Sequence, residues 1–166
     1  THSTSVSELL DLAIQLERHA HAVYTAMMRR FERHKEVTDF LNQMRGDEVY
    51  HEQLLEDARA ELTAEQLAAP ADPAMVVMAR AMLTVTPEER LIGMQNFADA
   101  HLVALKLENS EVNVLFAAIF DTLTSDKLRT KALGHEFDAH QANLAAFSER
   151  LGGQEGMKAI KALQPA

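Results

Sequence analysis

Acidic and imidazole side chains occupy several positions where an amphipathic helix should carry apolar residues. Glu17, Glu48, His51, Glu108 and His140 each fall within a run of apolar residues spaced three or four apart. This spacing places them on the buried face of a helix. A buried carboxylate without a partner is unfavourable, because the apolar contacts around it return less than its lost hydration. Carboxylates and imidazoles buried together suit iron or manganese, so we predict a metal site with oxygen and nitrogen ligands.

Two patterns support this prediction. Glu48 and His51 form a Glu-x-x-His motif, whose spacing stacks both side chains on one helix face within reach of one metal ion. Residues 12–17 read LAIQLE and residues 103–108 read VALKLE, so Glu17 and Glu108 are equivalent positions of an internal repeat. The alternative for Glu48 and His51 is a buried hydrogen-bonded pair that fixes helix register. For His140 it is a core histidine bonded to a backbone carbonyl or to Glu136.

The apolar spacing predicts long helices around these positions. The first begins at a Ser7 cap and the second follows a turn near residues 33–36. The third begins at Thr86, where Pro87 and Glu89 complete a capping box, and continues to about residue 123. The fourth ends at the glycine pair 152–153, and a short C-terminal helix follows from about residue 154.

The connections between these helices predict the fold. Short turns near residues 33–36 and 124–125 make two antiparallel hairpins, about 7–62 and 86–151. Residues 63–85 contain Pro70 and Pro73 and form a crossover that can travel the length of a bundle. We therefore predict an all-α chain, residues 1–166 as a single domain. Its fold is a ferritin-like antiparallel four-helix bundle with one long crossover between helices 2 and 3.

Composition narrows the partners and the chemistry. A formal net charge of −9 over 166 residues argues against nucleic acid as a partner. The absence of cysteine excludes disulfides, thiolate metal sites and iron–sulfur centres on these residues. No apolar run is long enough to span a membrane, and the N-terminal THSTSVSE lacks the order of a signal peptide. We expect a cytoplasmic protein that does not interact with membranes.

From about residue 7 to residue 151 the chain resembles the rubrerythrin family of ferritin-like di-iron proteins. The resemblance rests on Glu17, on the Glu48 and His51 motif, and on the string ENSE, which contains Glu108 and Glu111. It implies that the metal ligands are Glu17, Glu48, His51, Glu108, Glu111 and His140. It also implies that Tyr24, seven residues after Glu17, lies beside the metal. For Glu111 the alternative is a surface charge, and for His101 a structural role is expected rather than ligation.

The fourth helix departs from the family pattern. Aligning His140 with His51 places Phe137 where a second Glu-x-x-His motif would have its glutamate. Glu136 is one residue away, about 100° around the helix, and would need a rotation or a bulge to replace it. The resemblance implies two iron ions per chain, or one if Phe137 disables half of the site. Manganese is the alternative metal.

The function that the resemblance implies is that of a non-haem iron oxidoreductase, acting in peroxide reduction or ferrous iron oxidation. Because the chain lacks cysteine, electrons would come from an external donor protein. One alternative is a ferritin-like metal-binding protein with a degraded site and no turnover, and another is a metal-free structural bundle. A homodimer is expected in each case, since such bundles often pack or swap helix pairs.

Overall fold

The computed structural model describes residues 4–108 together with Leu115, Ala118, Ile119, Ala142, Asn143, Ala145, Ala146 and Glu149. Within this part of the chain the secondary structure is helical, apart from one isolated bridge between Ser5 and Pro70. The six helices named in it are α1 (Val6–Arg30), α2 (Lys35–Glu61), α3 (Ala64–Ala68), α4 (Pro73–Leu83), α5 (Pro87–Arg90) and α6 (Phe97–Glu108). None of the described helices is both long and apolar enough to cross a membrane.

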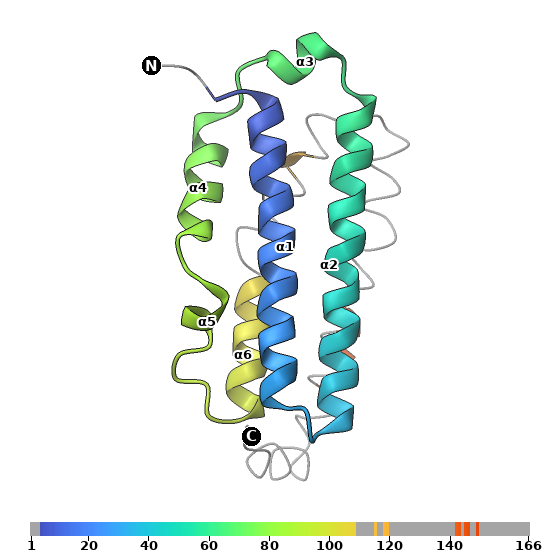
Figure 1. Cartoon of the computed structure of the whole chain (residues 1–166), viewed down its shortest axis with the longest axis vertical. Helices are drawn as coiled ribbons and strands as arrows, with labels where there is room; N and C mark the ends of the chain where they lie inside the picture. The colour runs from blue at the N-terminus through green and yellow to red at the C-terminus, as the bar shows by residue number, and fades with distance from the viewer. Residues whose placement is uncertain are drawn as a thin grey trace.

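The longest helices, α1 and α2, form an antiparallel hairpin, with the two helices side by side (Figure 1). Helix α1 begins two residues earlier than expected, because Ser5 rather than Ser7 is its cap. The Ser5 side chain accepts a hydrogen bond from the Glu8 amide, and the Glu8 carboxylate accepts one from the Ser5 amide. This capping box satisfies backbone amides that the first turn leaves free.

Between α2 and α6 the chain passes from one end of the hairpin to the other (Figure 1). Helix α3 lies at the end where α2 stops, and α4 then packs against α1. Asp72 caps α4 by accepting a hydrogen bond from the Ala74 amide, and Pro73 occupies the first turn, where its missing N–H costs nothing. That this segment joins two hairpins stays a prediction, because the second hairpin lies largely outside the described residues.

The expected start of the third long helix was wrong. The capping box of Thr86 and Glu89 is present, but it starts only the single turn of α5. The backbone then leaves the helix, with Gly93 at a φ of 82°, a conformation that glycine adopts without strain. Helix α6 starts afresh because Asn96 and Asp99 exchange side-chain-to-amide hydrogen bonds. The hydrophobic spacing alone did not reveal this second cap.

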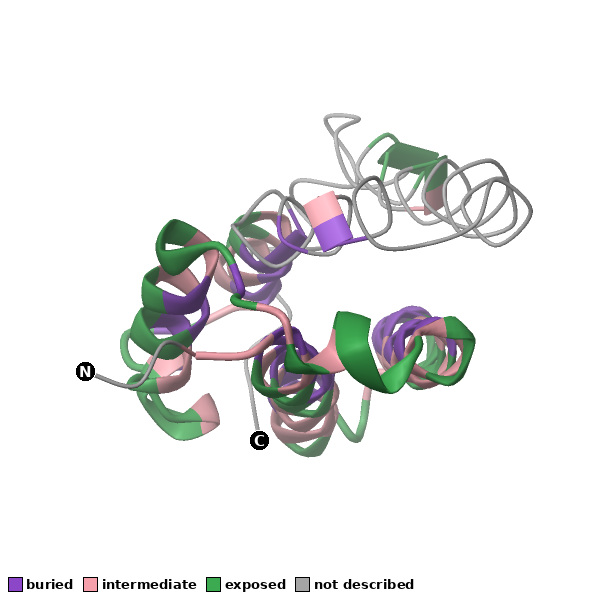
Figure 2. Ribbon diagram, turned by 90° about the horizontal axis from the view of Figure 1, so that it is seen from above, coloured by how far each residue is buried: buried purple, intermediate pink, exposed green. Residues whose placement is uncertain are grey.

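Two apolar clusters fill the interior, and Figure 2 shows the buried residues on the inner sides of the helices. The upper cluster lies toward the α1 N-terminus and includes Leu9, Leu10, Ala13, Ile14, Leu16, Leu54, Leu55, Ala58, Val76 and Ala79. The lower cluster lies toward the hairpin turn and includes Ala20, Val23, Tyr24, Met27, Phe31, Leu41, Met44, Phe97, Ala104 and Leu107. These clusters fix the three helices that position the candidate site.

Several predictions concern positions outside the described residues. They include most of the fourth helix, the C-terminal helix from about residue 154, and the candidate ligands Glu111 and His140. Phe137 and Glu136 are outside as well. The extent of the domain and the four-helix count therefore stay predictions.

Candidate metal centre

A layer of polar side chains separates the two apolar clusters. On α1, Glu17 follows Leu16 of the upper cluster and precedes Ala20 of the lower cluster. On α2, Glu48 and His51 fall between the two clusters in the same way. We call Glu17, Glu48, His51 and Glu108 the polar layer. They are the charged or polar residues buried among those described, with exposed fractions of 2%, 4%, 3% and 3%.

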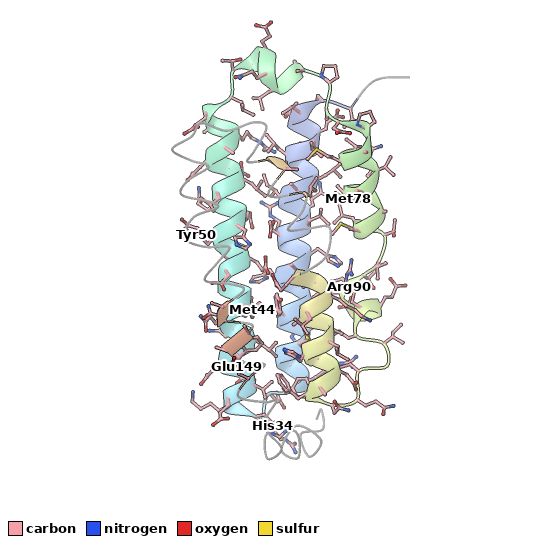
Figure 3. The ribbon with its side chains drawn as sticks, turned by 180° about the vertical axis from the view of Figure 1, so that it is seen from behind. His34, Met44, Tyr50, Met78, Arg90 and Glu149 are labelled. Atoms are coloured by element: carbon pink, nitrogen blue, oxygen red, sulfur yellow. The ribbon has the colours of Figure 1, made fainter. Side chains whose placement is uncertain are left out.

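The level of the polar layer can be followed on α2 and α6. Figure 3 labels Met44 and Tyr50, which bracket Glu48 along α2. Met44 belongs to the lower cluster, and the partly buried Tyr50 packs against the upper one. On α6, Glu108 directly follows Leu107 of the lower cluster. Apolar packing therefore lies on both sides of the layer and limits the access of water.

Three side chains of this layer converge. One potential ligand atom from each of Glu17, Glu48 and His51 lies within 4.8 Å of the other two. His51 Nδ1 is 3.4 Å from Glu48 Oε2 and 3.6 Å from Glu17 Oε2. The i, i+3 spacing brings Glu48 and His51 together on α2, and the packing of α1 against α2 brings Glu17 to them. We call these three residues the hairpin triad.

One oxygen of the hairpin triad lacks a hydrogen bond. Glu17 Oε2 has no hydrogen-bond partner among the described residues, and His51 Nδ1 lies 3.6 Å from it. Leaving a buried polar atom unsatisfied costs about 1–3 kcal/mol, and more when the group is charged. A cation bound between the two carboxylates and the imidazole would satisfy this oxygen. The donor set therefore fits a divalent metal ion.

The charges within the triad act strongly on His51. Burial by itself lowers the pKa of the imidazole, but the adjacent carboxylates of Glu17 and Glu48 outweigh it and raise the pKa to about 10. Without metal, the imidazolium is thus the positive charge that balances the carboxylates. A metal ligand must be neutral imidazole, so metal binding at this site would displace the proton.

Glu48 lies close enough to Glu17 and Glu108 to be affected by their charges. Burial raises its pKa well above the usual range, and the negative charges of Glu108 and Glu17 add to this, while the hydrogen bond to His51 opposes it. Carboxylates that repel one another in a dry interior are the arrangement that a divalent cation relieves. The layer has the charge, the burial and the ligand atoms of a metal centre.

Glu108 has a partner of its own. The Tyr24 hydroxyl donates a short hydrogen bond to Glu108 Oε1 in the buried interior. Burial raises the pKa of Tyr24 well above its usual value, and the charges of Glu108 and Glu48 raise it further. The phenol therefore stays protonated and remains a donor. Tyr24, a member of the lower cluster, thus contacts the polar layer through Glu108, and its predicted place beside a metal stays a prediction.

The structure does not add the remaining candidate residues to the triad. Glu111 and His140 are outside the described residues, so the structure does not test them. His101 lies on α6 two turns before Glu108 and is partly buried, and this burial lowers its pKa. It does not belong to the hairpin triad.

Sequence reasoning missed an ion pair next to the triad. Arg18, the neighbour of Glu17, donates two hydrogen bonds to Glu52 Oε1, of 2.9 Å from Nε and 2.7 Å from Nη2. Glu52 is the neighbour of His51, so the pair joins α1 and α2 at the level of the triad. In the sequence, the opposite charges of Arg18 and Glu52 stand beside the apolar faces of their two helices. Such charges could have indicated the ion pair, as they do in coiled coils.

The family model for rubrerythrin matches residues 8–126 of the chain. This match includes the whole hairpin triad, Tyr24 and Glu108. Neither the curated proteins nor the solved structures contain a match to the chain.

Proposed function

The chain belongs to the rubrerythrin family, and we propose that it is a non-haem iron oxidoreductase whose metal is held in the polar layer. Glu17, Glu48, His51 and Glu108 would hold iron, and Glu111 and His140 would complete the ligand set. When bound, iron supplies redox chemistry, either two-electron reduction of hydrogen peroxide or oxidation of ferrous iron by an oxidant. Manganese is the alternative metal.

The observation that carries the proposal is the convergence of the hairpin triad in a buried layer. A buried acid that served only to stabilise the fold would be expected to have its oxygens paired. Instead Glu17 Oε2 has no hydrogen-bond donor in the described part of the chain. Family membership supports the same conclusion.

The protein's own residues would perform three tasks. The carboxylates of Glu17 and Glu48 balance the charge of a divalent cation, and His51 contributes a neutral nitrogen after losing its proton. The apolar clusters on either side keep the layer dry, which strengthens its electrostatic interactions. Tyr24 holds Glu108 in one orientation. Electrons would come from a donor outside these residues, which contain no cysteine for an iron–sulfur centre.

One alternative has specific support. Only three ligands converge in the described residues, and Glu108 is engaged with Tyr24. Phe137 also stands where the family pattern expects a glutamate. These features favour a protein that binds a single metal ion without turnover. A homodimer in the cytoplasm is part of either proposal.

The test is peroxide consumption by the reduced protein. The full chain is reconstituted anaerobically with ferrous iron, freed of excess metal, and mixed with hydrogen peroxide or, separately, with oxygen and additional ferrous iron. We expect stoichiometric oxidation of the bound iron and turnover when a reductant is supplied. Glu17→Gln should lose both, whereas Glu32→Gln, the same change at an exposed position in the turn, should retain both.

The outcomes separate the alternatives. Iron bound without peroxide consumption or ferrous oxidation would overturn the oxidoreductase and leave the metal-binding protein. No iron bound after reconstitution would overturn both and leave a structural bundle.

A further inference from the structure

Helix α4 carries a large share of the methionines. Three of its 11 residues are Met75, Met78 and Met82, whereas the whole sequence of 166 residues contains eight. Their spacing of three and four residues places them along one side of the helix, on which Figure 3 labels Met78. Met82 is buried in the upper cluster, and Met75 and Met78 pack against this cluster while remaining partly exposed. Thioether side chains therefore make part of the apolar contact of α4 with the rest of the protein.

A thioether differs from other apolar side chains because peroxide can oxidise it. Hydrogen peroxide transfers one oxygen atom to the sulfur and leaves as water, while the sulfur gives up two electrons and becomes a sulfoxide. The sulfoxide is polar, so it packs poorly against apolar surface. Oxidation also requires access to the sulfur. Met75 and Met78 are partly exposed, whereas Met27 and Met44 of the lower cluster are fully enclosed.

Polar contacts attach both ends of α4 independently of its methionine sulfurs. Just before the helix, the Ala71 amide donates a hydrogen bond of 2.8 Å to the Thr4 carbonyl. In its last turn, the Met82 carbonyl accepts a hydrogen bond of 3.0 Å from Arg90 Nη2, and Arg90 Nε donates one of 2.9 Å to His19 Nε2 on α1. These bonds use backbone and nitrogen atoms, so a change at the sulfurs leaves their donors and acceptors in place.

We propose that α4 is an oxidation-sensitive strap, in which hydrogen peroxide converts Met75 and Met78 to sulfoxides and loosens the packing of α4 on the upper cluster. The attached ends keep the helix near α1, so reduction of the sulfoxides restores the packing. The oxidant is the peroxide that the proposed enzyme would consume, and the strap responds to peroxide that escapes consumption. This modification site goes beyond the proposed function and requires no bound metal.

Peroxide treatment of the metal-free full chain tests the strap. Peptide mass spectrometry follows oxidation at each methionine, circular dichroism gives the melting temperature, and hydrogen exchange reports the opening of the α4 backbone. The test variant is Met75→Leu with Met78→Leu, which keeps apolar volume and removes both sulfurs. The matched control is Met28→Leu, the same change at a partly exposed methionine of α1 that packs against the lower cluster.

The strap predicts where oxidation occurs and what it changes. Met75 and Met78 should be oxidised at least about tenfold faster than Met27 and Met44. The melting temperature of the oxidised wild-type chain should fall by roughly 3–8 °C, and the amides of α4 should exchange faster. The double leucine variant should show neither change, whereas Met28→Leu should respond as the wild-type chain does. Methionine sulfoxide reductases for both epimers should restore the original melting temperature.

Other results overturn the proposal. An equal loss of stability in the double leucine variant, or no loss in Met28→Leu, would show that another methionine is responsible. Sulfoxides at Met75 and Met78 with unchanged melting and exchange would show that the packing of α4 tolerates oxidation. A loss that the reductases do not reverse would contradict a strap that is held at both ends. None of these results bears on the metal centre, because the protein is metal-free throughout, and a chain that binds no iron would leave the strap intact.

Discussion

The same helices bury the apolar clusters and the polar layer, but burial has different energetic consequences in the two regions. In the upper cluster, side chains such as Leu10 and Leu55 are fully enclosed and have only apolar surface to pack. In the polar layer, Glu17 is equally enclosed but lacks a hydrogen bond for one oxygen in the described chain. The clusters therefore stabilise the fold, whereas the layer retains an unfavourable arrangement that a bound cation would relieve. Locally unfavourable arrangements of this kind are commonly found at functional sites.

The largest expected effect comes from the upper cluster. Leu10→Ala removes a fully buried side chain and leaves a cavity, so the free energy of unfolding should fall by about 2–5 kcal/mol. Chemical denaturation with and without metal would measure it. The loss should be similar in both conditions, because Leu10 lies two turns from Glu17 and contributes no ligand. A loss confined to the metal-loaded protein would contradict the division between clusters and layer.

Metal should stabilise the folded chain through the polar layer. A ligand that binds only the folded state at a concentration 100 times its Kd adds about 2.7 kcal/mol to the free energy of unfolding. We expect ferrous iron, added anaerobically, to raise the melting temperature, and chelator to reverse the rise. Glu17→Gln should abolish the shift. A melting temperature indifferent to metal and chelator would favour the structural bundle.

The metal-free protein should lose stability in alkaline solution. The pKa of His51 is raised from 6.5 to about 10 by its carboxylate neighbours, so the charged imidazole contributes stability that is fully present below about pH 6.5. This contribution disappears as the pH rises through about 10. Melting curves of the metal-free chain between pH 6 and pH 10 would show it. The His51→Gln variant should show a smaller pH dependence, and equal dependence in both proteins would refute this account of the triad.

A stabilising substitution is also expected in the layer. Glu17→Met replaces a carboxylate that has an unpaired oxygen with an apolar side chain between two apolar clusters. The metal-free protein should become more stable by about 1 kcal/mol, because the repulsion between the Glu17 and Glu48 carboxylates is removed while Glu48 remains to pair with His51. Metal binding should be lost at the same time. If the metal-free variant is instead much less stable, Glu17 is a structural partner of His51 and its unpaired oxygen has no functional meaning.

The smallest effect should come from the ion pair beside the triad. Arg18→Met removes the contacts to Glu52 while keeping an aliphatic side chain, and it should lower the melting temperature by about 2 °C or less, because exposed ion pairs contribute little. Metal affinity should fall by a few fold, since the pair joins the helices at the level of the triad. Asp11→Asn weakens another ion pair between α1 and α2, with Arg59, farther from the triad. It should leave metal affinity unchanged.

The hydrophobic periodicity of the sequence predicted which positions lie on buried helix faces. The seam spacing placed Glu17, Glu48 and His51 on buried helix faces, and the structure buries all three together. Their role as ligands stays a prediction, as do those of Glu111 and His140. The family resemblance is confirmed by the match to the rubrerythrin model.

What the sequence missed depends on short-range side-chain bonds and on helix packing. The periodic pattern continued through residues 91–96, so it hid the break that Gly93 and the Asn96 cap produce. The bond between Tyr24 and Glu108 joins residues far apart in the chain, and no local pattern encodes it. Such contacts can be identified only when the packing of α1 against α2 and α6 is known.

The most direct test of the central claim is the number of iron ions bound per chain. The protein would be purified without chelator, reconstituted anaerobically with ferrous iron, freed of unbound metal and analysed for iron and protein together with Glu17→Gln. We predict at least one iron per wild-type chain and a large loss in the variant. No iron in the wild-type protein after reconstitution would contradict the claim that the polar layer is a metal centre.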